Sequence, residues 1–369
     1  MKALKLNPLS LDTTPDADLE AAWRRLSKEA CDPNPFFGPD FLRPFLRAMQ
    51  DGKVTVHAIT DVDGRWLVAA PFKKRRAGLL VPSYASYANE YAPLGLPLLS
   101  PQAPPEAITL FLNSLDRESP TTLFPYARLD AATAAALRSV DGWSSLETAP
   151  ARRAAHDGGE RGREQFAEAF RGKRKKELSR LKRRLEDEGP LVLESHYGDD
   201  VPEQFERFLD LEKSGWKGKN TSALASHEDT VAFSRQAIAA MAVHKGVRID
   251  SMSVAGKPIA MMVVLTEGNR AFAWKIAYDE TYAKFSPGAH LSLYALETNL
   301  ANEALDGGDS LAVPGHPMIE PLWRGRMDYA TLIYAKGAAP NLRQKLTACD
   351  IQLEKKLREI ARKLLRRGA

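Results

Sequence analysis

The sequence has 369 residues, a formal net charge of +5, 44% apolar residues and 27% charged residues, which favours two globular domains and excludes a disordered or collagen-like chain. Its longest apolar run, residues 258–265, is too short to cross a bilayer, and its N-terminal residues lack the apolar core of an export signal. The two cysteines, Cys31 and Cys349, lie far apart without metal or redox spacing, so a cytoplasmic protein without a disulfide framework is expected.

The first 150 residues mix predicted helices and strands, which indicates an α/β domain. The predicted strands are 2–6, 54–60, 66–72 and 122–125, and the predicted helices are 18–29, 39–50, 106–115 and 131–138. The tyrosine-containing residues 82–97 are expected to form a loop. Small, polar and Gly-rich residues follow at 149–163, so we predict a first domain at 1–150 and a linker at 151–163.

A strongly basic segment, residues 171–184, holds nine Lys and Arg against the single acidic residue Glu177. Apolar residues recur at helical spacing from Phe166 to Leu185, which predicts one amphipathic helix. Such a cluster can contact nucleic acid, but this one lacks the interleaved aromatic residues that stack on single-stranded bases. We therefore interpret it as the solvated face of a helix.

The second domain, predicted at 164–340, follows the order β-α-α-β-β-β-α-β-β, which is typical of an α/β domain with a mixed sheet. The predicted strands are 191–195, 248–254, 257–266, 270–278, 309–313 and 329–336, and the predicted helices after the basic segment are 201–213, 228–244 and 288–305. Short Gly-containing turns join the strands between residues 248 and 278 into an antiparallel meander.

The C-terminal residues 341–369 carry nine Lys and Arg against three acidic residues. Leu353, Leu357, Ile360 and Leu364 recur on one face, which predicts a basic amphipathic helix. Such a helix can dock on the body of the protein, on a partner or on an anionic membrane surface. We favour docking on the body.

Glu212 interrupts the apolar stripe of the predicted helix 201–213, on the face that carries Phe205 and Phe208. An ionised carboxylate there is costly unless it is paired or faces a cleft. Glu212 is therefore either a general base or amine anchor at a substrate pocket, next to Trp216, or a structural residue, partly in water at the helix end or paired with a lysine. The pattern leaves both alternatives open.

The predicted strand 270–278 has two unlike faces, a bulky one that carries Tyr278 and a small one that carries Lys275. Small residues permit the close approach of a helix or a ligand. Lys275 could hold an anionic group or pair structurally with Glu212, and we favour the structural pair.

The following residues open the next predicted helix. Ser286 is a good N-cap, Pro287 suits the first helical position and Gly288 permits close approach to the backbone. The free N–H groups of a helix N-terminus can bind phosphate, and Lys284 adds a positive charge. The alternative is an ordinary capped helix.

Polar residues on the same predicted helix indicate a wet cleft beneath it, and a loop after it carries a candidate acid or base. His290, Tyr294 and Glu297 recur on one stripe of the helix 288–305. His316 lies in a loop framed by Pro and Gly, where it could act as a general acid or base or pack for its shape. The sequence contains no metal-ligand spacing, P-loop, GxGxxG or GxSxG motif, so no metal site is expected.

With these residues in view, the sequence resembles the GNAT-type acetyltransferase-like family of bacterial cellulose and exopolysaccharide biosynthesis proteins. The resemblance rests on LEKSGWKG (211–218), AGKPIA (255–260), AYDETYAKFSPG (277–288) and HPMIEPLW (316–323), and the first half fits at 34–42 and 91–99. The family is related to the Fem-type aminoacyltransferases, which pair two GNAT-like domains. The resemblance therefore implies two tandem GNAT-like domains, the first degenerate and the second an acyltransferase.

The resemblance also implies an acyl-CoA donor such as acetyl-CoA and an amine or hydroxyl acceptor on a sugar or small metabolite. The family binds the donor pyrophosphate at the loop that opens the central helix, which here comprises Lys284, Phe285, Ser286, Gly288, Ala289 and His290. This loop departs from the family's Gln/Arg-x-x-Gly-x-Gly form. The residue that takes the acceptor proton would be Glu212, Asp279 or His316, and the substrate pocket would contain Trp216, Lys275, Tyr278, Tyr294 and Glu297.

Two alternatives remain. The donor could be an aminoacyl-tRNA, as in Fem proteins, with the basic segments on its phosphates, although the helical-hairpin insertion of some Fem proteins is absent from the sequence. Apart from this case, nucleic acid is not an expected partner. The chain could instead be a non-catalytic scaffold that partners a polysaccharide synthase through its C-terminal helix.

Overall fold

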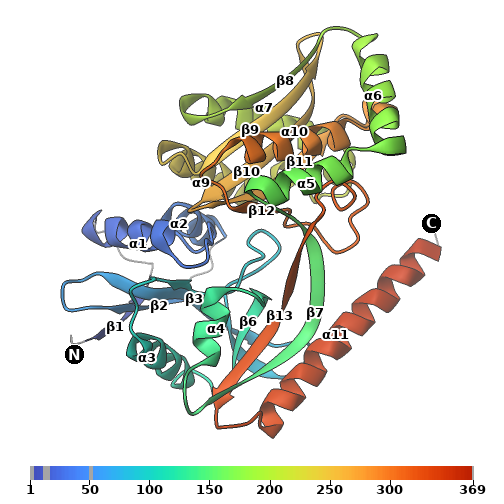
Figure 1. Cartoon of the computed structure of the whole chain (residues 1–369). Helices are drawn as coiled ribbons and strands as arrows, with labels where there is room; N and C mark the ends of the chain where they lie inside the picture. Colours follow the sequence, from blue (N-terminus) through green and yellow to red (C-terminus); the bar gives the residue numbers. More distant parts are fainter. Residues whose placement is uncertain (1–3, 11–16, 50–52, 368–369) are drawn as a thin grey trace. The chain divides into compact units, whose positions relative to one another are not determined.

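The computed structural model describes residues 4–10, 17–49 and 53–367 and shows a mixed α/β protein (Figure 1). The chain divides into two compact units. Unit 1 comprises residues 1–37, 52–151 and 328–369, and unit 2 comprises residues 38–51 and 152–327. Both units therefore draw on segments that lie far apart in the sequence. The domain boundaries predicted above stay a prediction.

The strands of unit 1 follow the order β1-β2-β3-β4-β6-β13-β7, in which β4 and β6 pair in parallel. These strands are β1 (Lys5–Ser10), β2 (Thr55–Thr60), β3 (Trp66–Arg76), β4 (Pro82–Ser86), β6 (Thr122–Arg128), β7 (Trp143–Asp157) and β13 (Gly325–Lys336), and the short β5 (Leu98–Leu99) pairs with β3. The helices are α1 (Ala17–Glu29), α3 (Pro105–Asp116), α4 (Ala132–Arg138) and α11 (Leu342–Arg367). Trp23 of α1 stacks on Trp66 of β3 with 5.5 Å between ring centroids, so α1 covers part of this sheet.

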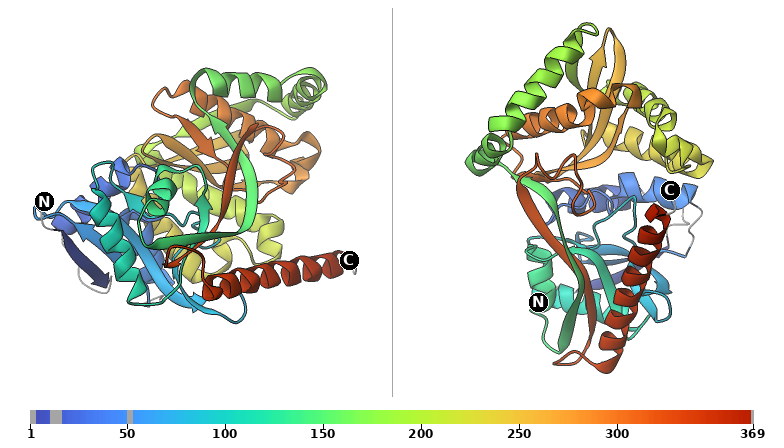
Figure 2. Two further views of the ribbon diagram at one scale, coloured as in Figure 1. Left: turned by 60° about the horizontal axis from the view of Figure 1, so that its bottom comes forward. Right: turned by 90° about the vertical axis from the view of Figure 1, so that its right-hand side faces the viewer.

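Helix α11 docks on unit 1 through a small and polar face. Gln344 is fully buried and donates to the carbonyls of Ser144 and Ile333, while Ala348 joins an apolar cluster. The predicted docking face was wrong. Leu353, Leu357 and Ile360 are exposed, and the side chain of Leu364 lies outside the described residues. Figure 2 shows that the C-terminal part of α11 extends past the strands of unit 1.

The strands of unit 2 follow the order β7-β12-β11-β10-β9-β8. They are β8 (Leu191–His196), β9 (Val247–Val254), β10 (Lys257–Glu267), β11 (Arg270–Tyr278) and β12 (Gly307–Asp309), together with the end of β7. The helices are α2 (Pro39–Ala48), α5 (Gly159–Ala169), α6 (Gly172–Glu186), α7 (Val201–Ser214), α8 (Trp216–Lys219), α9 (Glu228–Val243) and α10 (Pro287–Ala301). Helix α10 covers one face of the sheet, and α7 and α9 cover the other (Figure 2).

Strands β11 and β12 separate soon after they pair. Their parallel pairing joins Arg270–Phe272 to Gly307–Asp309, where β12 ends, so the predicted strand 309–313 starts and stops earlier than expected. Residues 273–278 continue to pair with β10 on their other side. Along these residues, no strand of the described chain covers the second edge of β11.

Three other predictions differ from the structure. The single amphipathic helix predicted from Phe166 to Leu185 is two helices, α5 and α6, because Phe170 leaves helical geometry and Gly172 takes a left-handed φ of 56° that favours glycine. The expected linker at 151–163 lies in β7 and α5, and the expected loop at 82–97 begins with β4. None of the helices in the described part of the chain is long and apolar enough to cross a membrane.

Candidate functional site

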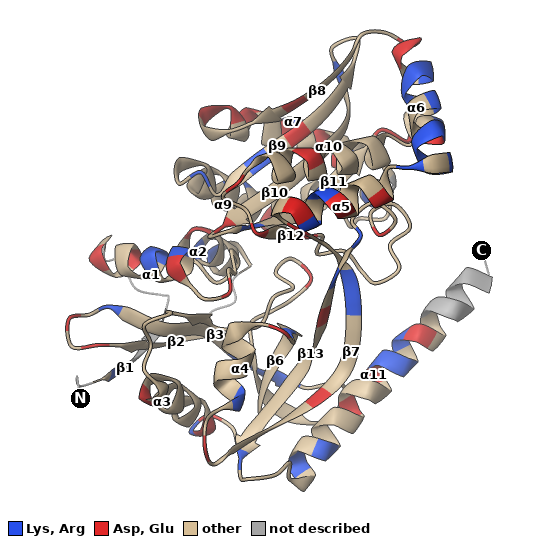
Figure 3. Ribbon diagram, viewed as in Figure 1, with Lys and Arg blue, Asp and Glu red and all other residues tan. Residues whose placement is uncertain are grey.

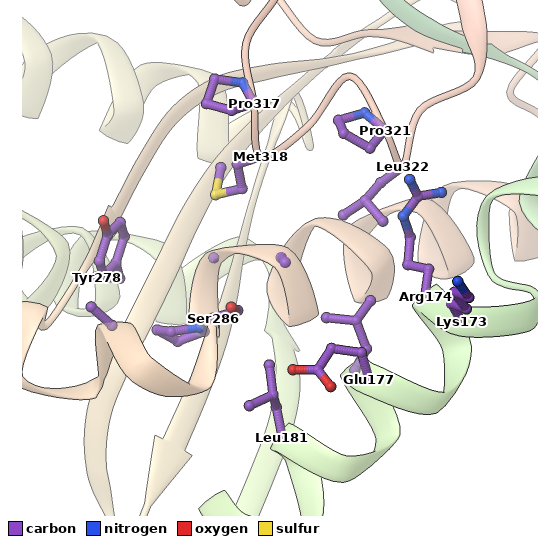
Figure 4. A pocket seen from close by; sticks show the side chains of 15 residues that line it. Lys173, Arg174, Glu177, Leu181, Tyr278, Ser286, Pro317, Met318, Pro321 and Leu322 are labelled. Carbon is purple, nitrogen blue, oxygen red and sulfur yellow. The ribbon is translucent and has the colours of Figure 1, made fainter.

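A cavity of about 650 Å³ lies in unit 2 between α6, the beginning of α10 and the loop 317–322 (Figure 4). Most of its wall is apolar, with a few charged and hydroxyl groups. The lining residues are Lys173, Arg174, Glu177, Leu178, Leu181, Tyr278, Ala283, Ser286, Pro287, Gly288, Ala289, Pro317, Met318, Pro321 and Leu322. A mostly apolar cavity with a few convergent polar groups is the usual form of a small-molecule site.

The first turn of α10 forms one wall of this cavity. Ser286 occupies the predicted N-cap position in a left-handed conformation (φ 55°, ψ 51°), but its hydroxyl makes no capping hydrogen bond. Pro287 follows in the first turn, as predicted. A helix N-terminus carries a partial positive charge, so this wall favours an anionic group.

Gly288 makes a close approach to the side chain of Met318. A Cβ atom at this position would lie 2.4 Å from the sulfur of Met318, which is far inside van der Waals contact. The space beside Gly288, where we predicted the approach of a ligand, holds Met318 of the loop 317–322. Gly288 and Ala289 both remain in the cavity wall.

The positive charges at the cavity come from α6. Lys173 and Arg174 are exposed residues in the first turn of this helix and line the cavity (Figures 3 and 4). Lys284 instead lies 3.7 Å from a carboxylate oxygen of Glu188 and 4.7 Å from the ring centre of Phe285. Lys173 and Arg174 were not among the predicted site residues, although the dense positive charge of the segment 171–184 could have indicated them.

The third wall is a loop that a buried tryptophan anchors. Trp323 is fully buried, and its indole N–H donates to the carbonyl of Ser292 in α10 at 3.1 Å. At the other end of the loop, the N–H of Gly315 donates to Glu320 at 2.6 Å. These contacts hold Pro317 and Met318 against the beginning of α10.

His290 and Phe285, around the beginning of α10, are buried, and neither lines the cavity. His290 is only 7% exposed, and its Nε2 atom has no hydrogen-bond partner among the described residues. Burial, reinforced by the charge of Lys182, lowers the pKa of His290 to about 4, so the ring is neutral at pH 7.

Glu212 is held by two donors. It is 2% exposed, accepts from Lys217 Nζ at 2.9 Å and accepts from the N–H of Leu224 at 2.8 Å. Lys217 also donates to the carbonyl of Ile276 in β11 at 2.7 Å. The ion pair expected for Glu212 therefore exists, but its partner is Lys217 and not Lys275.

The pKa values of Asp279 and His316 are both lowered, for different reasons. Burial would raise the pKa of Asp279, but hydrogen bonds from Lys257 and Thr281 outweigh it and lower that pKa. Burial, and then the charge of Lys217, lowers the pKa of His316 below its ordinary value of 6.5. The Nδ1 atom of His316 is buried and has no hydrogen-bond partner among the described residues. His316 directly precedes the cavity residues Pro317 and Met318.

The residues predicted to form the substrate pocket are dispersed. Tyr278 lines the cavity, whereas Lys275 lies in β11 with its ammonium 5.8 Å from the ring centre of Trp274. The side chain of Trp216 lies outside the described residues, and Glu297 is exposed on α10.

The expected wet cleft beneath α10 is a network of buried and half-buried polar side chains. The hydroxyl groups of Tyr294 and Ser195 lie 3.2 Å apart, and Ser195 donates to Asp250. Asp250 accepts two hydrogen bonds from Arg248, which also donates to Asn299 at 2.9 Å. Tyr294 therefore belongs to this network. Within the described residues, no three His, Cys, Asp or Glu side chains are grouped as metal ligands.

Residues 172–309 match the model of the Acetyltransferase (GNAT) domain. This match covers α6 to β12, including the cavity wall at α10 and the separated strands β11 and β12. No curated protein matches the sequence. The predicted fold class, a mixed α/β architecture with a GNAT-like domain, is confirmed.

Several solved structures share the fold at low sequence identity. FemX is 10% identical, with a TM-score of 0.54, 84% of this chain covered and 96% of that chain covered. L-PGS from Bacillus licheniformis is 13% identical, with a TM-score of 0.52 and coverages of 92% and 96%. A conserved protein of unknown function from Bacteroides thetaiotaomicron is 11% identical, with a TM-score of 0.54 and coverages of 90% and 100%. These likenesses establish the fold alone.

Proposed function

We propose that the protein is an acyltransferase that moves an acyl group from acyl-CoA to an amine or hydroxyl of a sugar or small metabolite. The observation that carries the proposal is the cavity of about 650 Å³, because it joins the N-terminal turn of α10 to Lys173 and Arg174 of α6. A helix N-terminus and two cations together suit the phosphate groups of CoA. The match of residues 172–309 to the GNAT acetyltransferase domain supports the same reaction class.

The acyl group would lie along the open edge of β11. The carbonyl of Ile276 accepts from Lys217, which is not a strand neighbour, so it faces away from β10. In a β-strand the N–H and C=O of one residue point to the same edge, so the N–H of Ile276 faces this edge too. That N–H would donate to the thioester carbonyl and stabilise the negative charge that develops on its oxygen.

His316 is the base that we propose among the three candidates. Both carboxylate oxygens of Glu212 already accept hydrogen bonds, and Asp279 has a lowered pKa that makes it a weak base. His316 has an unpartnered Nδ1 and a pKa below 6.5, so its ring is neutral at pH 7 and able to accept a proton. The acceptor nitrogen or oxygen would lose its proton to His316 as it attacks the thioester carbon, and CoA would leave as the thiolate.

Calorimetric titration of the full chain tests the proposal. Acetyl-CoA is expected to bind, and S-acetylpantetheine, which lacks the phosphate groups, is expected to bind at least about tenfold more weakly. Equal affinity for the two ligands would contradict the phosphate site. Absence of acetyl-CoA binding at millimolar concentration would contradict the proposal as a whole.

A second candidate donor is an aminoacyl-tRNA, and the charge of α6 favours it. Residues 171–184 carry nine cations, and most of them are exposed. Contacts with several phosphates would make tRNA affinity fall steeply with salt. A gel shift with aminoacylated tRNA across salt concentrations separates the two donors, since acetyl-CoA has far fewer phosphates. An acceptor in exopolysaccharide synthesis is proposed on the sequence resemblance only.

A further inference from the structure

Helix α11 has an apolar stripe that faces away from unit 1. The stripe consists of Leu342, Leu346, Leu353, Leu357 and Ile360, whose exposed fractions range from 46% to 72%. At 100° per residue these positions fall within a narrow sector of the helix surface. Large apolar side chains gathered on one exposed face mark an interaction surface more strongly than scattered ones.

The helix is fixed to unit 1 by polar side chains that do not belong to the stripe. Asp350 accepts hydrogen bonds from the backbone N–H groups of Gly78, Leu79, Leu80 and Val81 at 2.9 to 3.1 Å. Thr347 is also fully buried, and so is Gln344, which lies opposite the stripe on the helix surface. The body therefore cannot cover the stripe without giving up these contacts, and the stripe is available to another surface.

The charges of α11 decide which surface it suits. Between residues 342 and 361 the helix carries five cations against three acidic residues, and Asp350 is engaged by the body. The cations are Arg343, Lys345, Lys355, Lys356 and Arg358. Pairing of two copies of α11 along the stripe would bring together Arg343, Lys345 and Lys356, which flank it, so a second copy is a poor occupant. An anionic surface with an apolar interior is complementary to both features.

We propose that α11 binds the surface of an anionic lipid bilayer, with the apolar stripe at the level of the acyl chains and the cations at the headgroups. Amphipathic helices with cationic flanks bind in this orientation, and each Lys or Arg near an anionic leaflet adds to the affinity. The helix is already folded and fixed to unit 1, so binding requires no folding of this segment. The inference is independent of the proposed acyl transfer.

Flotation of the full chain with lipid vesicles tests the proposal. The protein is expected to float with equimolar phosphatidylglycerol–phosphatidylcholine vesicles and to remain at the bottom with pure phosphatidylcholine. The double variant L353E/L357E is expected to lose flotation, while V243E, which alters an exposed valine of α9, keeps it. Because the stripe is exposed, L353E/L357E is expected to unfold at the wild-type temperature.

A charge variant completes the design. K345E/K356E is expected to reduce the floated fraction by about tenfold, because it removes two exposed cations that flank the stripe and adds repulsion. K28E/K53E makes the same change of charge at exposed lysines elsewhere and is expected to float like the wild type. Failure of the wild-type protein to float with anionic vesicles would overturn the proposal. A wild-type dimer in light scattering that L353E/L357E abolishes would also overturn it, since the stripe would then be a self-interface.

Discussion

Glu212 shows how a single buried carboxylate can hold a loop and a strand together. Its partner Lys217 bonds Glu212 at 2.9 Å and the Ile276 carbonyl at 2.7 Å, so the pair links the end of α7 to β11. The sequence pattern identified Glu212 as anomalous but left catalysis and structure as equal alternatives. The contacts favour structure, because a carboxylate with both oxygens engaged is poorly placed to accept a substrate proton.

The substitution E212Q tests this structural role. We expect it to lower the free energy of unfolding by about 1–3 kcal/mol, because the charge-assisted bond to Lys217 is lost at a buried site. Urea denaturation measures the change. E203Q is the matched control on the same helix, since Glu203 is 70% exposed and its pair with Arg207 should contribute little. An unchanged free energy of unfolding in E212Q would contradict the structural role and leave catalysis as the explanation for Glu212.

His316 is expected to titrate below pH 6.5, because burial and the charge of Lys217 both disfavour the imidazolium. Acyl transfer that needs the neutral ring should therefore persist below pH 6.5 and fall as the pH drops through the lowered pKa. Histidine ring NMR, with H316Q for assignment, measures this pKa directly. K217M should raise it, since a positive charge is removed and Glu212 is left unpaired. A His316 pKa at or above 6.5 would rule out this explanation.

At the scale of elements, the beginning of α10 depends on a contact that is remote in the sequence. Gly288 can approach Met318 only because it lacks a Cβ atom. We expect G288A to lower the free energy of unfolding by about 1–3 kcal/mol through overpacking, and G288A/M318A to recover most of it. G246A is the control, because the nearest atom to its Cβ would lie 3.4 Å away. Thermal unfolding measures these three variants and M318A alone, and additive effects of G288A and M318A would show that the two sites do not pack together.

Asp350 is expected to hold the beginning of α11 against the turn 78–81 in a pH-dependent way. Burial would raise the pKa of Asp350, but its four backbone N–H donors outweigh burial and lower it. The stabilisation is thus complete above the ordinary value of 3.8 and is lost as the pH falls through the lowered pKa.

Hydrogen exchange of the turn amides measures this contact. D350N should accelerate exchange at residues 78–81, while E359Q, on the exposed side of α11, should leave it unchanged. Protection at these amides that D350N does not reduce would show that Asp350 is not what holds the helix.

At the scale of the whole molecule, local sequence patterns predicted most elements but not their faces. Helices α7, α9 and α10 and the β9–β11 meander follow from periodicity and turn residues. The exposure of the α11 leucines could not be predicted from local patterns. It depends on which face of α11 docks, and Asp350 and Gln344 dock through hydrogen bonds to segments about 200 or more residues away. The cavity likewise joins α6 to α10 across more than 100 residues, so α6 was interpreted as a solvated surface.

The most direct test of the acyl-CoA site is a pair of charge reversals on α6. K173E/R174E alters the two cations in the cavity wall, and K176E/R183E makes the same charge change at exposed residues of α6 that do not line it. Calorimetry with acetyl-CoA should show at least about a tenfold loss of affinity for the first variant and near wild-type affinity for the second. Equal affinities in the two variants would contradict a donor site between α6 and α10.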